Sequence, residues 1–224
     1  MERRKSMERI EELKERIFFS ATKLFLKHGY RNTSIRMIGQ ESGISHTQVI
    51  YHFTGKTNLG KQVIQNYFHV LIQLLSTHAS IINGDSYQNN KLLWWSYHYL
   101  ILTSYDGFAR FYLQFITDDS EAFFDTVKPI VTKVYHDMFG LNVDLSNKSQ
   151  MADLQLISGV DMVLTRLCIN KTLKVREAIH KLLNLKFFEG FCLDTTEDKI
   201  ETFILDNQVL DAISDFDISA LNQI

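Results

Sequence analysis

A shortage of turn-forming residues is the feature that most restricts the fold of this chain. Its 224 residues include one proline and ten glycines, where average usage predicts roughly 11 and 16. An all-β sandwich or barrel needs a turn about every 8 to 12 residues, and a doubly wound α/β fold places glycines at its strand-to-helix corners. Long helices fit the shortage best, so the chain is predicted to be all-α.

Apolar residues recur at helical spacing along most of the sequence. Polar stretches at 83–90 and about 140–148 predict loops. The lone Pro129 falls in a predicted helix, where it predicts a kink or two shorter helices that meet there. The predicted helices span these approximate ranges: 10–28, 35–42, 45–53, 56–80, 91–105, 107–117, 120–139, 149–170, 174–191 and 196–216.

Charge is distributed unevenly along the chain. Residues 1–61 carry twelve Lys and Arg against six Asp and Glu, a net charge of +6, whereas residues 62–224 carry twelve against twenty, a net charge of −8. A basic end beside an acidic body is typical of a nucleic-acid-binding protein, although a basic helix face is also often merely solvated.

The basic end contains two short predicted helices joined by a tight Glu-Ser-Gly-Ile turn at 41–44. Such a pair is typical of a helix-turn-helix, in which the second helix enters the major groove of DNA while the first crosses the backbone. Ser45 and Gln48 have the spacing of a capping box, in which each side chain bonds a backbone N–H of the first turn.

The residues around this turn follow an ordered pattern: Phe25, Gly29, Thr33-Ser34, Ile38-Gly39, Ser42-Gly43-Ile44-Ser45, His52-Phe53, Lys56 and Leu59. In this order and spacing, over residues 10–59, the chain resembles the TetR family of bacterial transcriptional regulators. The resemblance implies an N-terminal three-helix DNA-binding domain at 1–56 and a larger helical ligand-binding and dimerisation domain at 57–224. It also implies a homodimer that binds a double-stranded DNA operator and responds to a small-molecule inducer.

One position departs from the family pattern. Where the family usually has a phosphate-binding tyrosine, this chain has Ile50, and Tyr51 follows one place later. The sequence leaves open whether Tyr51 replaces that contact. Gln48 also has two interpretations, because its amide can pair with adenine N6 and N7 or close the capping box. His52 suits either a phosphate contact or a packing role.

The remaining polar residues of the basic end are sorted by their chemistry. Thr33 and Lys56 suit phosphate oxygens, whereas Arg36, His46 and Thr47 lie at predicted helix starts and are expected to reach base edges. The predicted DNA-binding residues are Thr33, Arg36, Ser45, His46, Thr47, Gln48, Tyr51, His52 and Lys56.

Aromatic side chains are dense in the helices predicted at 91–105 and 107–117. Such density is usual in a hydrophobic core, but by resemblance to the family it also suits a pocket for a small, mainly apolar molecule that a few polar groups orient. The candidate ligand-binding residues are Trp95, His98, Tyr99, Phe111, Gln114 and Phe115.

The helices predicted near 149–170 and 174–191 are strongly apolar, and Ser158-Gly159 allows another helix to approach closely. They are either buried within one protomer or, as the family resemblance implies, form the interface of the homodimer. A dimer places two recognition helices about 34–36 Å apart on successive turns of a palindrome.

Signatures of enzymes are missing from the sequence. It has no P-loop, dinucleotide fingerprint, HExxH motif or nucleophile elbow, and its histidines lack metal-ligand spacing. Asp118, Asp119 and Glu121 cluster at a predicted helix start, where they suit the helix dipole. We therefore expect no enzymatic activity, cofactor or metal.

The N-terminus has no apolar run that could form the core of a signal peptide. Two uncharged stretches, 62–84 and 92–105, are too polar or too short to span a membrane. The chain is therefore expected to be cytoplasmic, with no membrane partner.

Together these features predict a ligand-responsive transcriptional repressor that binds a palindromic operator as a homodimer. One alternative is a TetR-like protein controlled by a partner protein instead of a small ligand. Another is a helical binding or scaffold protein whose DNA-binding unit has decayed, which Ile50 in place of the family's tyrosine would fit.

Overall fold

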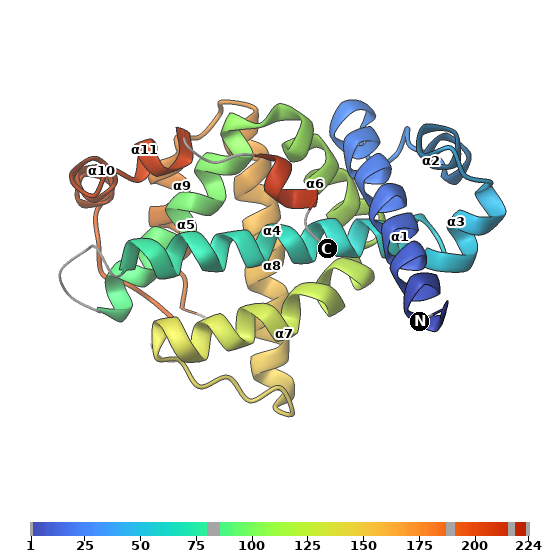
Figure 1. Ribbon diagram of the computed structural model, residues 1–224. Helices are drawn as coiled ribbons and strands as arrows, with labels where there is room; N and C mark the ends of the chain where they lie inside the picture. The colour runs from blue at the N-terminus through green and yellow to red at the C-terminus, as the bar shows by residue number, and fades with distance from the viewer. Residues whose placement is uncertain (1, 80–85, 187–190, 215–217, 223–224) are drawn as a thin grey trace. The chain divides into compact units, whose positions relative to one another are not determined.

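Figure 1 shows the computed structural model of the protein, which describes residues 2–79, 86–186, 191–214 and 218–222. Every element of regular structure within these ranges is helical, so the all-α prediction is confirmed. The helices are α1 (Glu2–His28), α2 (Ile35–Ser42), α3 (His46–Phe53), α4 (Lys56–Ala79), α5 (Tyr87–Ser104), α6 (Asp106–Asp118), α7 (Ser120–Phe139), α8 (Lys148–Ile169), α9 (Val175–Leu183), α10 (Glu197–Asp206), α11 (Val209–Ser214) and the 3₁₀ helix η1 (Ile218–Asn222).

The start of α5 differs from the prediction, because the helix begins at Tyr87 inside the segment predicted as a loop. Ser86 is its N-cap: the hydroxyl accepts a hydrogen bond from the N–H of Asn89 at 3.1 Å. This cap allows the polar residues 87–90 to form the first turn. Residues 83–85 of the predicted loop lie outside the described residues.

The later helices also differ from the prediction. α9 ends at Leu183 rather than near residue 191, and residues 187–190 lie outside the described part of the chain. The segment predicted as one helix at 196–216 is interrupted by Gln208, whose φ of +51° separates α10 from α11. α7 continues through Pro129, which excludes two separate helices at that point.

The chain divides into two compact units. The first contains Met1–Tyr67, Gly107–Phe123 and Ile218–Ile224, and the second contains Phe68–Asp106 and Phe124–Asp217. This division differs from the predicted domain boundary after residue 56, because the first unit also includes α6 and the beginning of α4. That residues 1–56 contain all of the DNA-binding residues stays a prediction.

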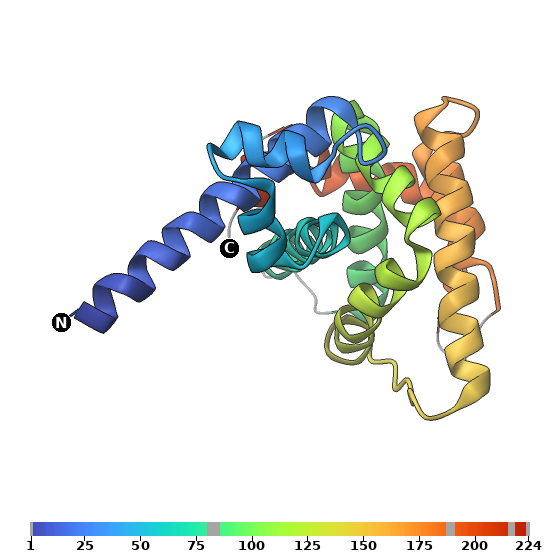
Figure 2. The same cartoon turned by 90° about the vertical axis from the view of Figure 1, so that its right-hand side faces the viewer.

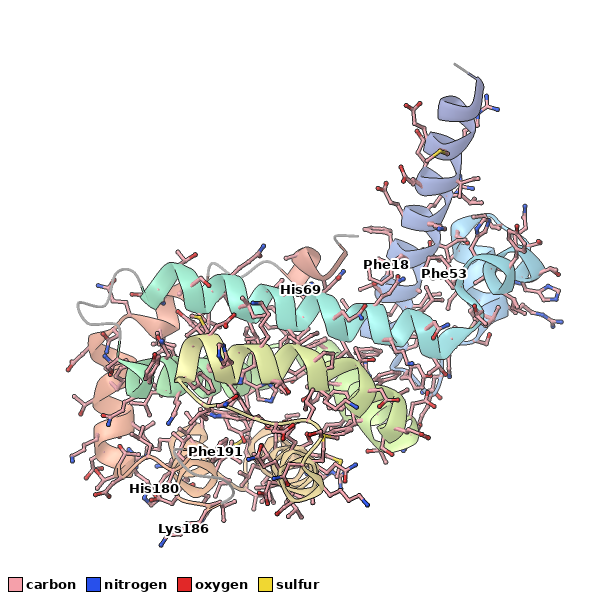
Figure 3. The ribbon with its side chains drawn as sticks, turned by 90° about the horizontal axis from the view of Figure 1, so that it is seen from below. Phe18, Phe53, His69, His180, Lys186 and Phe191 are labelled. Atoms are coloured by element: carbon pink, nitrogen blue, oxygen red, sulfur yellow. The ribbon has the colours of Figure 1, made fainter. Side chains whose placement is uncertain are left out.

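Aromatic packing explains why α6 belongs to the first unit. Phe25 of α1 stacks on Phe111 of α6 with ring centres 5.1 Å apart, and Tyr30 meets Phe115 edge-on, also at 5.1 Å. These rings anchor α6 to the end of α1. Phe18 of α1 and Phe53 of α3, labelled in Figure 3, are also buried, and α2 packs against both of these helices.

α5 is the central helix of the second unit. Its residues 90–99 are all buried, and the helix packs against α8, α9, α10 and α11. A helix that is apolar on nearly every face is stable only in such an enclosed position. α8 runs along the outer side of this unit (Figure 2). None of the described helices combines the length and the hydropathy that a membrane span requires.

Candidate nucleic-acid interface

Local capping interactions position the two helices of the helix-turn-helix. The hydroxyl of Ser34 accepts a hydrogen bond from the N–H of Met37 at 3.2 Å and begins α2. Gly43 ends α2 with a φ of +67°, a conformation that favours glycine because it has no β-carbon. A β-carbon on Gly39 would lie 2.7 Å from the carbonyl oxygen of Ile44, so glycine also permits the close approach after the turn.

The predicted capping box at the start of α3 is confirmed. The hydroxyl of Ser45 accepts a hydrogen bond from the N–H of Gln48 at 3.2 Å, and Gln48 Oε1 accepts one from the N–H of Ser45 at 3.4 Å. The hydroxyl of Ser45 also donates to this Oε1 at 3.2 Å. The amide of Gln48 is therefore already engaged, which favours the capping interpretation in this state of the protein.

α3 has a buried face and an exposed face. Val49 and Phe53 are 0% and 5% exposed and fix the helix against the rest of the unit. Ile50 and Tyr51 are 47% and 83% exposed, and the ring of Tyr51 meets the half-buried His52 edge-on at 5.0 Å. The other exposed side chains of this helix are His46, Thr47 and Gln48.

Thr33 departs from its predicted position. Its side chain is 2% exposed, and its hydroxyl donates to the carbonyl oxygens of Gly29 at 2.8 Å and Leu24 at 3.2 Å. Both bonds tie the loop before α2 to the end of α1. The hydroxyl is thus used inside the unit rather than presented at its surface.

Lys56 also makes contacts within the unit. Its Nζ donates to the carbonyl oxygen of Tyr30 at 3.0 Å and lies 4.1 Å from the centre of the Tyr30 ring. Burial lowers the pKa of Lys56, and the nearby carboxylates of Asp119 and Asp118 oppose that effect. Lys56 therefore anchors the first turn of α4, whereas Arg36 at the start of α2 is exposed.

An acidic corner between α6 and α7 holds the loop before α2. Arg31 donates to Asp118 through Nε at 2.7 Å and Nη2 at 2.6 Å, a bidentate pair. The hydroxyl of Tyr30 donates to Asp119, and the hydroxyl of Thr57 donates to the same carboxylate at 3.2 Å. The interpretation of these two aspartates as partners of a helix dipole was incomplete, because their side chains bind residues more than 60 positions away in the sequence.

The comparisons with known proteins agree with this geometry. Residues 17–63 match the model of a family described as bacterial regulatory proteins, tetR family. This part of the chain is a TetR-family helix-turn-helix domain. The match begins in α1 and ends in α4, so it contains the complete turn and the recognition helix α3.

Relatives extend the similarity to transcriptional regulators beyond this segment. The HTH-type transcriptional regulator SAS2464 of Staphylococcus aureus strain MSSA476 is 26% identical over 190 residues, which cover 85% of this chain and 95% of that protein. The probable HTH-type transcriptional regulator YttP of Bacillus subtilis strain 168 is 30% identical over 79 residues, which cover 35% of this chain and 38% of that protein. These names agree with the prediction that the chain is not an enzyme.

Two solved structures are distantly similar. The fatty acid degradation regulator FadR from Bacillus halodurans has a TM-score of 0.49 and 13% identity, covering 75% of this chain and 93% of that one. SmeT, the repressor of the Stenotrophomonas maltophilia multidrug efflux pump SmeDEF, has a TM-score of 0.46 and 13% identity, covering 82% of this chain and 94% of that one.

The six candidate ligand residues lie in different units. Phe111, Gln114 and Phe115 belong to the first unit, where the two phenylalanines are core residues and Gln114 Oε1 accepts a hydrogen bond from the N–H of Arg31 at 3.1 Å. Trp95, His98 and Tyr99 belong to the second unit. The structure therefore does not group the six residues in one compact unit.

The three residues in the second unit form a buried cluster on α5. The ring of Trp95 meets His98 edge-on at 5.7 Å and stacks on Tyr99 at 6.1 Å. His98 Nε2 lies 3.1 Å from Asp161 Oδ1 on α8, and both side chains are at least 92% buried. The indole Nε1–H of Trp95 is buried and has no hydrogen-bond acceptor within the described part of the chain. This cluster combines aromatic rings with a few buried polar groups.

The two predicted interface helices differ in exposure. The apolar residues Ile179, Leu182 and Leu183 of α9 are all 0% exposed, so they belong to the interior of the protomer. On α8, Leu156 and Val163 are 57% and 49% exposed. Of these two helices as the structure describes them, α8 has exposed apolar side chains on its outer face and α9 has its apolar side chains buried. No cluster of three or more metal-binding side chains occurs among the described residues.

Proposed function

We propose that the protein is a ligand-responsive transcriptional repressor that binds a palindromic operator as a homodimer. The observation that carries this proposal is the exposed, capped recognition helix α3 within the segment that matches the tetR family. The net charge of +6 over residues 1–61 supports binding to a polyanion.

The exposed residues of the helix-turn-helix supply the proposed DNA contacts. Arg36 at the start of α2 suits a phosphate or a guanine edge, because a guanidinium can donate two parallel hydrogen bonds to either. His46 and Thr47 stand in the first turn of α3, the part of a recognition helix that reaches base edges. Ser45, Tyr51 and His52 extend this surface, whereas Thr33 and Lys56 position the helices from inside the unit.

The outer face of α8 is the proposed dimer interface. Ala152, Leu156, Gly159 and Val163 are all exposed and follow the three- and four-residue spacing of one helix face. A β-carbon on Gly159 would meet no atom within 4 Å, so the glycine leaves room for a second helix. Two copies of this face make the self-complementary contact of a twofold dimer.

The cluster around Trp95 is the proposed ligand site. Its rings suit a mainly apolar molecule, and the indole N–H, which can only donate, suits a carbonyl or another acceptor on that molecule. Ligand binding would shift the population of conformers toward one that no longer fits the operator.

Binding to the DNA upstream of the protein's own gene tests the DNA-binding proposal. We expect a specific complex that weakens steeply with salt, because phosphate contacts release counterions. Arg36→Ala should weaken it, whereas Lys186→Ala, which removes an exposed cation of the second unit (Figure 3), should not. Absent binding, or binding without sequence preference at every salt concentration, would contradict the proposal.

Tryptophan fluorescence tests the ligand site. Lipophilic compounds with a carbonyl or carboxylate group should cause a saturable change, and Trp95→Phe should weaken binding about tenfold by removing the donor. Trp94→Phe is the matched control, since Trp94 is equally buried but packs against Phe139 and Phe68 instead. An equal effect of both variants would argue against a role for the Trp95 donor.

A further inference from the structure

We infer that Ile50 is a specificity-determining residue that reads the C5-methyl group of a thymine in the major groove. The inference rests on the proposed DNA binding and assigns the position a role different from a phosphate contact.

Ile50 is the exposed one of the two aliphatic residues of α3. The helix buries its other aliphatic residue, Val49, completely, whereas 47% of Ile50 remains accessible. His46 and Thr47 precede Ile50 by four and three residues, so all three lie on one side of the helix. This exposed side is the one that a recognition helix turns toward base edges.

The chemistry of Ile50 excludes most DNA contacts. An isoleucine side chain has no hydrogen-bond donor or acceptor, so it cannot bind a phosphate oxygen or pair with the polar edge of guanine, adenine or cytosine. The thymine methyl group is the apolar feature that the major groove offers. Burying Ile50 against this methyl group removes apolar surface of both partners from water.

The neighbours of Ile50 strengthen the same preference. The methyl group of Thr47 lies one turn earlier on the same side and also suits a thymine methyl group. The amide of Gln48, which would favour adenine, is held by the capping box. Ile50 and the methyl group of Thr47 are therefore the apolar groups on this otherwise polar surface, and they should favour a thymine at one fixed position in each half-site.

Deoxyuridine substitution in the operator isolates this contact. Uracil pairs like thymine and keeps the O4 acceptor but lacks the methyl group. Replacing each thymine in turn should identify one position per half-site at which affinity falls about fourfold, the value for one buried methyl-sized group. Substituting both half-sites together should lower affinity about fifteenfold, because the two contacts are independent.

Ile50→Ala completes the test as a double-substitution cycle. The affinity of the variant for the thymine operator should be about that of the wild-type protein for the operator with uracil in both half-sites. Uracil substitution should then lower the affinity of the variant almost no further. Ile10→Ala is the matched control: this isoleucine on α1 is similarly exposed, at 43%, and lies outside the helix-turn-helix. Its affinity for both DNAs should equal that of wild type.

Each other outcome has a defined meaning. If the protein binds its operator specifically but no uracil substitution changes affinity, the inference is overturned while the proposed function stands. An equal loss by Ile50→Ala on thymine and uracil DNA also overturns it, because the side chain then acts without the methyl group. If no specific DNA binding exists, the proposed function itself fails. Circular dichroism melting verifies that the variant is folded.

Discussion

The recognition helix α3 and the central helix α5 are held in place by different interactions. α3 has eight residues, and its start depends on hydrogen bonds between Ser45 and Gln48. α5 has eighteen residues that are buried on nearly every side, and its buried His98 pairs with Asp161. The start of the first helix is thus fixed by local polar bonds, whereas the second is held by burial along most of its length, with one buried polar pair. Substitutions in α3 should mainly change DNA binding, and those around α5 should mainly change stability.

The largest expected effect comes from removing the carboxylate that faces α5. Asp161→Ala should lower the free energy of unfolding by about 3 kcal/mol, because it leaves a buried polar partner without its counterpart. Urea unfolding measures this change. Asp153→Ala is the control on the same helix, since Asp153 is only half-buried, and it should change stability by less than about 0.5 kcal/mol. Equal effects of the two variants would show that α5 does not depend on the pair.

The next effect concerns the outer surface of the same unit. Leu156→Glu should raise the dimer dissociation constant more than about tenfold by placing like charges in an apolar contact. The stability of the protomer should change little, because Leu156 is already 57% exposed. Sedimentation measures the oligomeric state. Leu205→Glu on α10, where the leucine is 61% exposed, is the control and should leave the dimer intact.

A smaller effect is expected at the start of α3. Ser45→Ala removes the N-cap and should cost about 1 kcal/mol. Because the cap positions the recognition helix, DNA affinity should fall as well, which binding assays and thermal unfolding measure together. Ser149→Ala, at an exposed serine in the first turn of α8 where Asn147 is the cap, should change neither quantity. A loss of stability without any loss of DNA affinity would show that the cap stabilises α3 but does not contribute to DNA binding.

The smallest effect is a dependence on pH in the first unit. The hydrogen bonds from Arg31 hold the pKa of Asp118 below its usual value. A carboxylate with a lowered pKa stabilises the folded state above about pH 4, and this contribution disappears as the pH falls through the pKa of the folded state. Asp118→Asn should remove this part of the pH dependence, by no more than about 0.5 kcal/mol because the pair is partly exposed. Unfolding curves from pH 6 to pH 2.5 measure it.

Short-range signals in the sequence were sufficient for the DNA-binding helices. The capping box and Gly43 act within four residues, so the limits of α2 and α3 could be predicted almost to the residue. The start of α5 differs from the prediction. Residues 87–90 are polar and typical of a loop, but the N-cap at Ser86 allows them to form the first helical turn. Local propensity alone does not reveal whether such a polar segment forms a loop or a capped helical turn.

Long-range contacts could not be predicted in the same way. Arg31 and Asp118 are 87 residues apart, and Tyr30 and Asp119 are 89 residues apart. Nothing in the spacing of these residues indicates that they meet, since the contact depends on how α6 packs against α1. For the same reason, the aromatic density of the sequence places Phe111 and Phe115 among the predicted ligand-binding residues. In the structure, their rings pack against Phe25 and Tyr30.

If Gln48 contacts a base as predicted, its capping box competes with the DNA for the same amide oxygen. An adenine that pairs with this amide has to displace the two hydrogen bonds that Gln48 Oε1 accepts from Ser45, whereas the bond from the N–H of Gln48 to the Ser45 hydroxyl can remain. A net loss of about 1 kcal/mol from these hydrogen bonds lowers the apparent affinity for such a contact about fivefold. Under the proposed DNA binding, pairing of Gln48 with adenine is therefore weakened from within the protein rather than by the shape of the groove.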